Sequence, residues 1–189
     1  MDRIEKILRD QREELLSTDF TQFVSRKEEA EIDLNSKLAQ IVIGVRRCGK
    51  STLCQKVLVQ SNVNFAYVNF DDETLAFLQS SQLNDVLEML YRIYGSFTHL
   101  FMDEIQNIAS WHLFVNRLLR QGIHLVVTGS NANLLSGELS THLTGRYNEI
   151  RLFPFSFAEY CQANEVDTGA LTTKARGELL HTLDTYLMR

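Results

Sequence analysis

One stretch decides the fold of this chain: Ile41-Val42-Ile43-Gly44-Val45-Arg46-Arg47-Cys48-Gly49-Lys50-Ser51-Thr52. It begins with a short apolar run of β-branched residues, which is typical of a strand buried on both faces. The spacing G-x-x-x-x-G-K-[ST] follows, in which glycines let the backbone turn its N–H groups inward around a polyphosphate. A helix predicted over 50–60 adds the positive end of its dipole. The stretch therefore predicts a strand, a phosphate-binding loop and a helix in succession.

This loop predicts a site for ATP with Mg²⁺. We expect the Lys50 ammonium to reach the β- and γ-phosphates and the Ser51 hydroxyl to bind the metal. Background residue usage makes a chance match to this spacing rare. The predicted nucleotide-binding residues are Gly44, Val45, Arg46, Arg47, Cys48, Gly49, Lys50, Ser51 and Thr52.

Strand-like and helical patterns alternate on either side of the loop. Apolar or β-branched runs occur at 39–43, 64–70, 99–102, 123–128 and 149–153. Helical spacing occurs at 2–17, 50–60, 73–93, 109–120, 133–143 and 172–189, and the charged stretch 25–35 is interpreted as a second short helix. Strands separated by helices pair in parallel through right-handed crossovers. The predicted fold class is α/β.

Two carboxylates follow the strand predicted at 99–102. Asp103 is expected to hold the metal with its water shell, and Glu104 to take a proton from an attacking water. An acidic pair that merely ends a strand and caps a helix is the alternative interpretation. Its position at the tip of a strand some fifty residues after the loop favours the catalytic one.

Three further groups of polar residues are candidates with open alternatives. Ser130 and Asn131 closely follow the strand at 123–128. One of them could orient water or sense the γ-phosphate, since open α/β sheets bind ligands at the carboxyl ends of strands. A turn or helix N-cap explains Asn131 equally well. Arg146 precedes the last strand and is either a surface ion-pair residue or an arginine finger for a neighbouring subunit. Arg46 and Arg47 either contact a partner or pair with the acidic turn at 71–72.

Composition narrows the class of protein. The chain has 189 residues, 44% of them hydrophobic and 23% charged, which is typical of a globular domain with one core. It contains no apolar run of membrane-spanning length and no secretory signal, so we expect a cytoplasmic protein with no membrane partner. The net charge of −5 argues against a surface devoted to nucleic acid, although it leaves room for a local basic patch. The three cysteines show no zinc spacing.

Further motifs follow the loop along the chain. They are Tyr67-Val68-Asn69-Phe70-Asp71, Asp103-Glu104-Ile105-Gln106 with Trp111, Thr128-Gly129-Ser130, Leu143-Thr144-Gly145-Arg146 and Leu152-Phe153-Pro154-Phe155-Ser156-Phe157-Ala158-Glu159-Tyr160. With the loop, this series resembles the prokaryotic AAA+ ATPases that join an N-terminal ATPase domain to a C-terminal domain of unknown function, sometimes likened to nuclease folds.

The resemblance implies a five-stranded sheet in the order 5-1-4-3-2, and the roles given above for Lys50, Ser51, Asp103 and Glu104. It implies a homo-oligomer in which Arg146 acts as a finger. It also implies an N-terminal helical extension over 1–36, an ATPase core over 37–165, and the start of a helical lid over 166–189. Because helical spacing continues to the last residues, we expect the natural protein to continue into the rest of the lid and a C-terminal domain.

The leading hypothesis is a module that hydrolyses ATP to drive a conformational change in an attached domain or partner. A nucleotide-dependent switch or scaffold with little turnover is the alternative. A DNA-processing motor is a third hypothesis, which the negative charge disfavours. A kinase for a small acceptor is also open, but the pair Asp103-Glu104 suits water better. No guanine-reading Asn-Lys-x-Asp motif occurs, which favours ATP.

Overall fold

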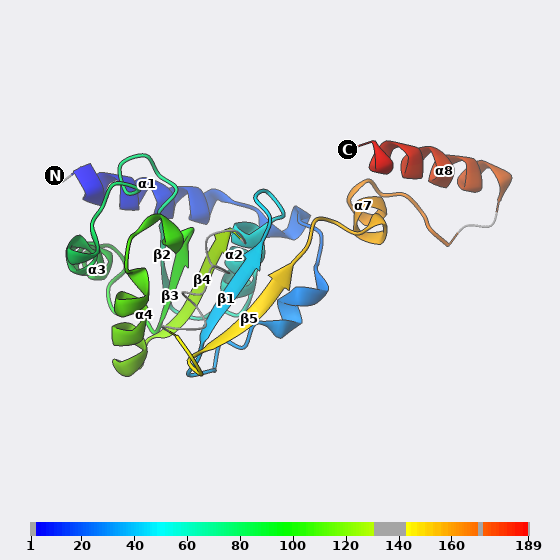
Figure 1. Ribbon diagram of the computed structural model, residues 1–189. Helices are drawn as coiled ribbons and strands as arrows, with labels where there is room; N and C mark the ends of the chain where they lie inside the picture. The colour runs from blue at the N-terminus through cyan, green and yellow to red at the C-terminus, as the bar shows by residue number, and fades with distance from the viewer. Residues whose placement is uncertain (1–2, 131–142, 170–171, 189) are drawn as a thin grey trace.

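The computed structural model describes residues 3–130, 143–169 and 172–188. Five strands form one parallel sheet in the order β2-β3-β4-β1-β5, which confirms the predicted order (Figure 1). The strands are β1 (Ala39–Gly44), β2 (Phe65–Asn69), β3 (His99–Asp103), β4 (His124–Ser130) and β5 (Tyr147–Leu152). The α/β fold class is also confirmed.

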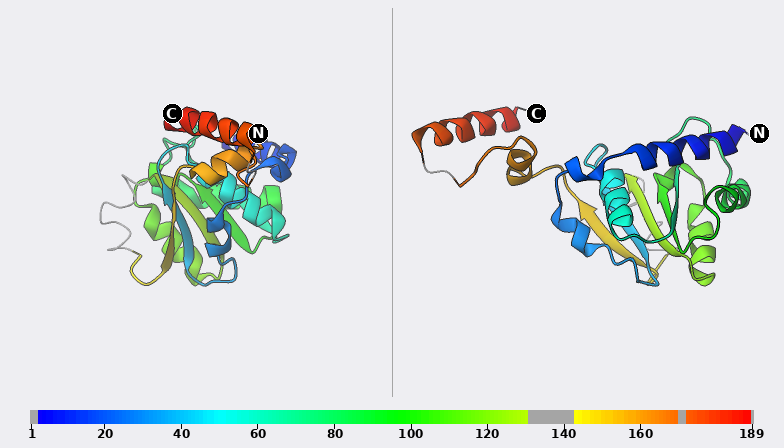
Figure 2. Two further views of the ribbon diagram at one scale, coloured as in Figure 1. Left: turned by 90° about the vertical axis from the view of Figure 1, so that its right-hand side faces the viewer. Right: turned by 180° about the vertical axis from the view of Figure 1, so that it is seen from behind.

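Helices cover both faces of this sheet, as Figures 1 and 2 show. The helices are α1 (Arg3–Ser17), α2 (Lys50–Gln60), α3 (Leu83–Tyr94), α4 (Trp111–Arg120), α7 (Phe157–Ala163) and α8 (Thr173–Leu187). Short 3-10 helices are η1 (Phe20–Gln22), η2 (Lys27–Glu31), η3 (Ser80–Gln82) and η4 (Ile105–Asn107). The order of strands and helices produces two hydrophobic cores, one on each face.

The larger core joins the sheet to α3 and α4, and it includes the fully buried Trp111. The smaller core joins the opposite face to α2, around Phe101. Every residue of β1 is buried, as expected of a central strand covered on both faces. Helix α1 contributes Leu8 to the larger core and Leu15 to the smaller one. The sheet is therefore a rigid platform, and its carboxyl edge is where the phosphate-binding loop begins.

Two predicted helices differ from the structure. Helix α3 begins at Leu83, so the prediction of a helix from residue 73 was wrong over its first ten residues. There the Asp72 carboxylate accepts a hydrogen bond from the Thr74 amide and starts a turn, while Leu75 and Leu78 enter the core from that turn. Their apolar spacing imitates a helix. Within the stretch 25–35, only Lys27–Glu31 is helical, as the 3-10 helix η2. Most of the helix predicted at 133–143 lies outside the described residues.

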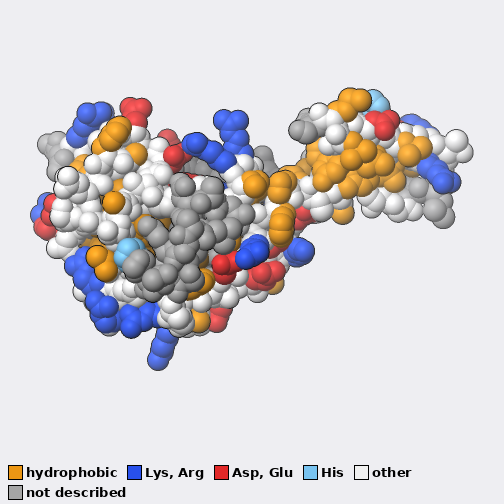
Figure 3. Space-filling view, viewed as in Figure 1, with side chains coloured by type: hydrophobic (Ala, Val, Ile, Leu, Met, Phe, Trp, Pro, Cys, Tyr) orange, Lys and Arg blue, Asp and Glu red, His pale blue; other side chains and the backbone are white. Residues whose placement is uncertain are grey.

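Helices α7 and α8 lie past the carboxyl end of β5, beside the sheet (Figures 1 and 2). Tyr186 of α8 donates a hydrogen bond to the Phe155 carbonyl at 2.8 Å, and its ring packs on Tyr160 of α7. Apolar side chains gather over these two helices (Figure 3). Leu180 and Leu187 of α8 are exposed. None of the helices in the described part of the chain is both long and apolar enough to cross a membrane.

Candidate functional site

The loop between β1 and α2 has a backbone that only its particular residues permit. A Cβ on Gly44 would lie 2.2 Å from the Leu152 carbonyl oxygen, so β1 can approach β5 this closely only with glycine. Gly49 caps α2 with a φ of 96°, in the left-handed region that favours glycine. Arg47 also has a positive φ, of 66°. Turns of alternating hand direct successive amides toward one concave side, which makes an anion-binding nest.

Lys50 is the first residue of α2, and its side chain folds back beneath the loop. The ammonium is buried and donates hydrogen bonds to the carbonyls of Gly44 at 3.4 Å and Val45 at 3.3 Å. Its Nζ also lies 3.3 Å from Oε1 of Glu104. The three donors of this ammonium already face two carbonyls and the Glu104 carboxylate, so a phosphate that binds here would take the place of Glu104.

Asp103 and the hydroxyl of Thr128 form the centre of the site. Strand β4 lies between β3 and β1, so Thr128 lies between the acidic pair and the loop. The Thr128 hydroxyl donates a hydrogen bond to Asp103, and the Ser51 hydroxyl lies near enough to that carboxylate to lower its pKa. Burial raises the pKa of Asp103 above its ordinary value, and the Glu104 charge adds to this, while the two hydroxyls and Lys50 oppose it. A positive charge at this point would relieve the desolvated carboxylate.

The donor set here suits Mg²⁺. Magnesium prefers hard oxygen ligands and is usually bound by one or two protein groups with waters and substrate phosphates. The Ser51 hydroxyl and the Asp103 carboxylate supply such oxygens and lie near each other. No cluster of three His, Cys, Asp or Glu side chains that could hold a metal occurs among residues 3–130, 143–169 and 172–188. The residues present thus fit a metal shared with a phosphate ligand.

Glu104 has a conformation that turns its side chain out of the line of β3. Its φ is 51°, and its amide donates a hydrogen bond to the Thr128 hydroxyl at 3.0 Å. Its carboxylate contacts Lys50 through one oxygen and accepts a hydrogen bond from Gln106 through the other. A non-glycine residue in the left-handed region is uncommon and is often found at functional sites. Glu104 is thus held beside the lysine that follows the loop.

The structure separates the candidates at the end of β4. Ser130 pairs in register with Gly44, so it lies at the carboxyl edge next to the start of the loop. Asn131 lies outside the described residues. Ser130 and Asn131 were the predicted candidates to orient water or sense the γ-phosphate. The hydroxyl that contacts both acidic residues belongs instead to Thr128. A threonine two residues from a strand's end was the available signal.

The two arginines of the loop lie on its outer side. Arg46 donates to Asp71 at 2.9 Å, and both side chains are largely exposed. This contact confirms the predicted alternative that a loop arginine pairs with the acidic turn after β2. An exposed pair of this kind contributes little to stability.

Arg146 lies at the opposite edge of the sheet from the loop. It immediately precedes β5, and its carbonyl accepts a hydrogen bond from the amide of Ala39 at the start of β1. Six residues of β5 separate it from the carboxyl edge, which is roughly 20 Å. Arg146 therefore does not contact the phosphate-binding loop of its own chain, and the finger role that the sequence analysis gave it needs a second subunit.

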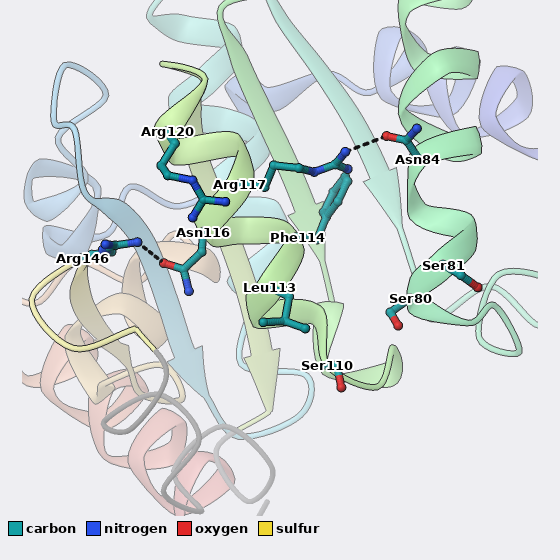
Figure 4. Close-up of a pocket in the computed structure, with 10 residues that line it drawn as sticks. All are labelled: Ser80, Ser81, Asn84, Ser110, Leu113, Phe114, Asn116, Arg117, Arg120 and Arg146. Carbon is teal, nitrogen blue, oxygen red and sulfur yellow. Dashed lines mark hydrogen bonds between the residues drawn. The ribbon is translucent and has the colours of Figure 1, made fainter.

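A groove of about 590 Å³ surrounds Arg146 and follows α4 (Figure 4). Among the described residues, its lining contains three arginines, Arg117, Arg120 and Arg146, with serine, asparagine, leucine and phenylalanine side chains and no carboxylate. Arg146 donates to Asn116 at 2.8 Å, and Arg117 donates to Asn84 at 2.8 Å. The groove is a basic surface distinct from the loop (Figures 3 and 4).

Two crevices border the loop on its other side. The smaller, of about 110 Å³, lies between the N-terminal segment and α2, with Phe23, Leu53 and Phe155 among its lining residues. The larger, of about 700 Å³, lies between the loop and the pair α7–α8, with Gly49 and Tyr186 in its lining. A ligand on the loop therefore borders both the core and α7–α8.

Arg26 is a residue of this region that the sequence analysis missed. Its guanidinium is buried and donates to the carbonyl of Cys48 in the loop at 3.4 Å. It also contacts Glu159 at 2.6 Å. Glu28 lies 3.9 Å from Nε of Arg26, but the acceptors of its guanidinium hydrogen bonds are all distant in sequence, so no local pattern marks Arg26. Glu159 was visible as the fourth residue of Ser-x-x-Glu, a capping-box pattern.

Known proteins resemble this chain over the part that contains the loop and the acidic pair. A family model described as an AAA domain matches residues 36–161. An uncharacterized protein of Methanocaldococcus jannaschii is 33% identical over 159 residues, which is 83% of this chain and 36% of that protein. An uncharacterized protein of Haemophilus influenzae is 37% identical over 139 residues, which is 68% of this chain and 34% of that protein. The matches cover only about a third of each relative's length.

Proposed function

We propose that this chain, which belongs to the AAA domain family, binds ATP on the loop at 44–52 and hydrolyses it. One observation carries the proposal: Lys50, Asp103 and Glu104 converge with two hydroxyls at the carboxyl ends of neighbouring parallel strands. Phosphoryl transfer to water needs little more than an anion cradle, a metal-binding carboxylate and a base that orients water. Those parts lie together here.

Each residue would then have a defined task. The loop amides and Lys50 hold the β- and γ-phosphates, and phosphate oxygens compete with Glu104 for the ammonium. Ser51 and Asp103 would hold Mg²⁺, which when bound neutralises charge on the phosphates. Glu104, released from Lys50, orients a water and accepts its proton. Gln106, bonded to the other carboxylate oxygen, keeps Glu104 directed into the site.

The base of the nucleotide would lie in the small crevice next to α2. Its lining combines aromatic rings, Phe23 and Phe155, with Leu53, which suits the flat apolar faces of adenine. The crevice borders Gly49, so a nucleotide with its phosphates on the loop reaches it directly. The larger crevice beside α7–α8 supports a role in conformational change, because a bound nucleotide would contact both sides of it.

The test of hydrolysis is the variant Glu104→Gln. We expect it to bind ATP at least as tightly as the wild type, because it removes the Glu104 charge that competes with phosphate for Lys50. Phosphate release should fall by about 10²–10⁴-fold, the usual contribution of a positioned base. Glu88→Gln on α3 is the matched control, since Glu88 is exposed and pairs with Arg92 on its own helix. Unchanged phosphate release in Glu104→Gln would contradict the assigned base.

A low-turnover switch is the second candidate, and one contact favours it. Glu104 is bonded to both Lys50 and Gln106, so its carboxylate must leave one partner before it can act as a base. The same measurements of ATP binding and phosphate release decide between the two functions. If wild-type release of phosphate is negligible and Glu104→Gln leaves it unchanged while ATP still binds, the switch is the better account.

Arg146 would complete a neighbouring subunit's site in a homo-oligomer, with the attached C-terminal region of the longer protein as the part that moves. Mixing experiments test this directly. Lys50→Met and Arg146→Ala chains should each be inactive, and their mixture should regain activity, because an intact Arg146 from the first serves the intact loop of the second. Activity of Arg146→Ala alone, equal to wild type, would contradict the finger role.

A further inference from the structure

Arg26 connects two segments that are distant in sequence. It precedes the 3-10 helix η2, and its side chain is only 6% exposed. One nitrogen, Nη1, donates to the carbonyl of Cys48 inside the phosphate-binding loop at 3.4 Å. Nη2 donates to the carbonyl of Phe153, on the connection between β5 and α7, at 2.8 Å. Nε donates to Glu159, in α7 itself, at 2.6 Å. A single side chain thus bonds to the loop and to the start of the α7–α8 unit.

The contact with Cys48 restricts the loop. A trans peptide directs its C=O and the following N–H to opposite sides, and the described residues contain no cis peptide bond. When Arg26 holds the Cys48 carbonyl, the Gly49 amide therefore points away from Arg26. Gly49 can rotate easily because it has no side chain, so an external hydrogen bond is needed to fix this peptide plane.

The contact with Glu159 restricts α7. The second carboxylate oxygen of Glu159 accepts hydrogen bonds from the Ser156 amide at 2.8 Å and from its hydroxyl at 2.7 Å. The same carboxylate therefore both caps the start of α7 and holds Arg26. The Phe155 ring, which precedes this cap, lies 4.8 Å from the guanidinium carbon. A shift of α7 would break several of these contacts together.

The backbone that carries Arg26 is fixed to α2. Lys56 of α2 is buried and donates to Glu29 at 2.8 Å and to Ser25 at 2.9 Å. Glu29 also accepts a hydrogen bond from the Arg26 amide at 2.8 Å. Arg26 thus extends from a segment anchored to the helix that begins at Lys50. Its two targets, the loop peptide and α7, are the parts that can move relative to this anchored segment.

We propose that Arg26 is a positioning residue that couples the conformation of the phosphate-binding loop to the orientation of α7 and α8. The inference rests on the proposed binding of ATP to the loop. A polyphosphate draws in the Gly49 amide and so changes the position of the Cys48 carbonyl on the other side of that peptide. The guanidinium shares its donors among three acceptors, so a change at Cys48 alters its geometry at Phe153 and Glu159.

The experiment combines calorimetry with hydrogen exchange on the full chain. Affinity for magnesium ADP and for a magnesium complex of a non-hydrolysable ATP analogue is measured by titration, and exchange is followed over 154–163 with and without saturating nucleotide. The variants are Arg26→Lys and Glu159→Gln. Arg151→Lys is the matched control, because Arg151 also pairs with a glutamate, Glu149, but is exposed on β5.

In the wild type and the control, nucleotide should change exchange over 154–163. Arg26→Lys keeps the charge, but its donors all belong to one nitrogen and cannot span the three acceptors that the planar guanidinium reaches, so it should bind about tenfold more weakly. Its exchange over 154–163 should stay unresponsive even when the site is saturated. Glu159→Gln should bind within about threefold of wild type, since the loop contact remains, yet also lose the response. Loss of response at saturation separates coupling from mere weakening of the fold, which thermal melts of each variant measure independently.

Two results would overturn the inference in distinguishable ways. If the wild type binds nucleotide and Arg26→Lys responds as the wild type does, the coupling is wrong while the proposed function stands. If no magnesium nucleotide binds to the folded wild type, both fail. A control variant that loses the response as fully as Arg26→Lys would also contradict a specific role for Arg26.

Discussion

Replacing Gly44 by alanine tests how the phosphate-binding loop is held against the sheet. The added Cβ would meet the Leu152 carbonyl oxygen at 2.2 Å and the Cys48 sulfur at 2.8 Å, whereas real Cβ contacts are essentially never under 3.0 Å. The closer obstacle is the backbone of β5, which cannot rotate away as a side chain can. Overpacking of a core costs about 1–3 kcal/mol, and we expect the upper end here. For a domain of this size that corresponds to a melting temperature lower by about 6–12 °C.

The assay is urea unfolding followed by circular dichroism, with a thermal melt and a nucleotide titration of the same sample. Because Cys48 lies in the loop, Gly44→Ala should also weaken magnesium ATP binding. The control is Gly177→Ala in α8, where a Cβ meets nothing within 4 Å; helix propensity favours alanine there by up to about 1 kcal/mol. A Gly44→Ala protein that melts within about 1 °C of wild type and binds ATP equally well would refute this account of close packing.

Two further predictions concern buried polar groups. Thr128→Val removes the hydroxyl that donates to Asp103 and accepts from the Glu104 amide, so unfolding in urea should show a loss of about 1–3 kcal/mol; an unchanged midpoint would show that water replaces the hydroxyl. The pKa of His99 is lowered by burial, helped by the nearby His124, so its neutral form stabilises the fold above the unfolded-state pKa of about 6.5 and that contribution is lost as the pH falls through the folded pKa. His99→Gln should flatten this fall in unfolding free energy between pH 7.5 and pH 5, and an equally steep fall would assign it elsewhere.

The sheet could be predicted because its strands are short, apolar and separated by clear helical spacing. Strand β1 is the best example, since three consecutive β-branched residues precede a glycine that only a loop of this type requires. The segment after β2 could not be predicted as well. Leu75 and Leu78 are buried by a turn that Asp72 starts, and periodicity does not distinguish such a turn from a helix.

The candidate site divides along the same line. Lys50, Ser51 and the acidic pair lie within local motifs whose chemistry is evident from spacing, and the structure brings them together. Arg26 and Thr128 act through partners more than twenty residues away, at Cys48 and Asp103. Such contacts depend on which strands become neighbours and on how the N-terminal segment packs. Local sequence therefore identifies neither partner, although the position of Thr128 near the end of a strand marked it as a candidate site residue.

Calorimetry tests most directly whether the loop and its lysine bind a polyphosphate. Magnesium ATP is titrated into the folded chain and into its Lys50→Met variant. We expect saturable binding of one nucleotide per chain, and a loss of affinity of about tenfold or more when the charge-assisted contact of Lys50 is removed. Lys174→Met, at an exposed position on α8, should bind as the wild type does. Absence of binding in folded wild-type protein, or equal affinity in Lys50→Met, would contradict binding of a polyphosphate by the loop and its lysine.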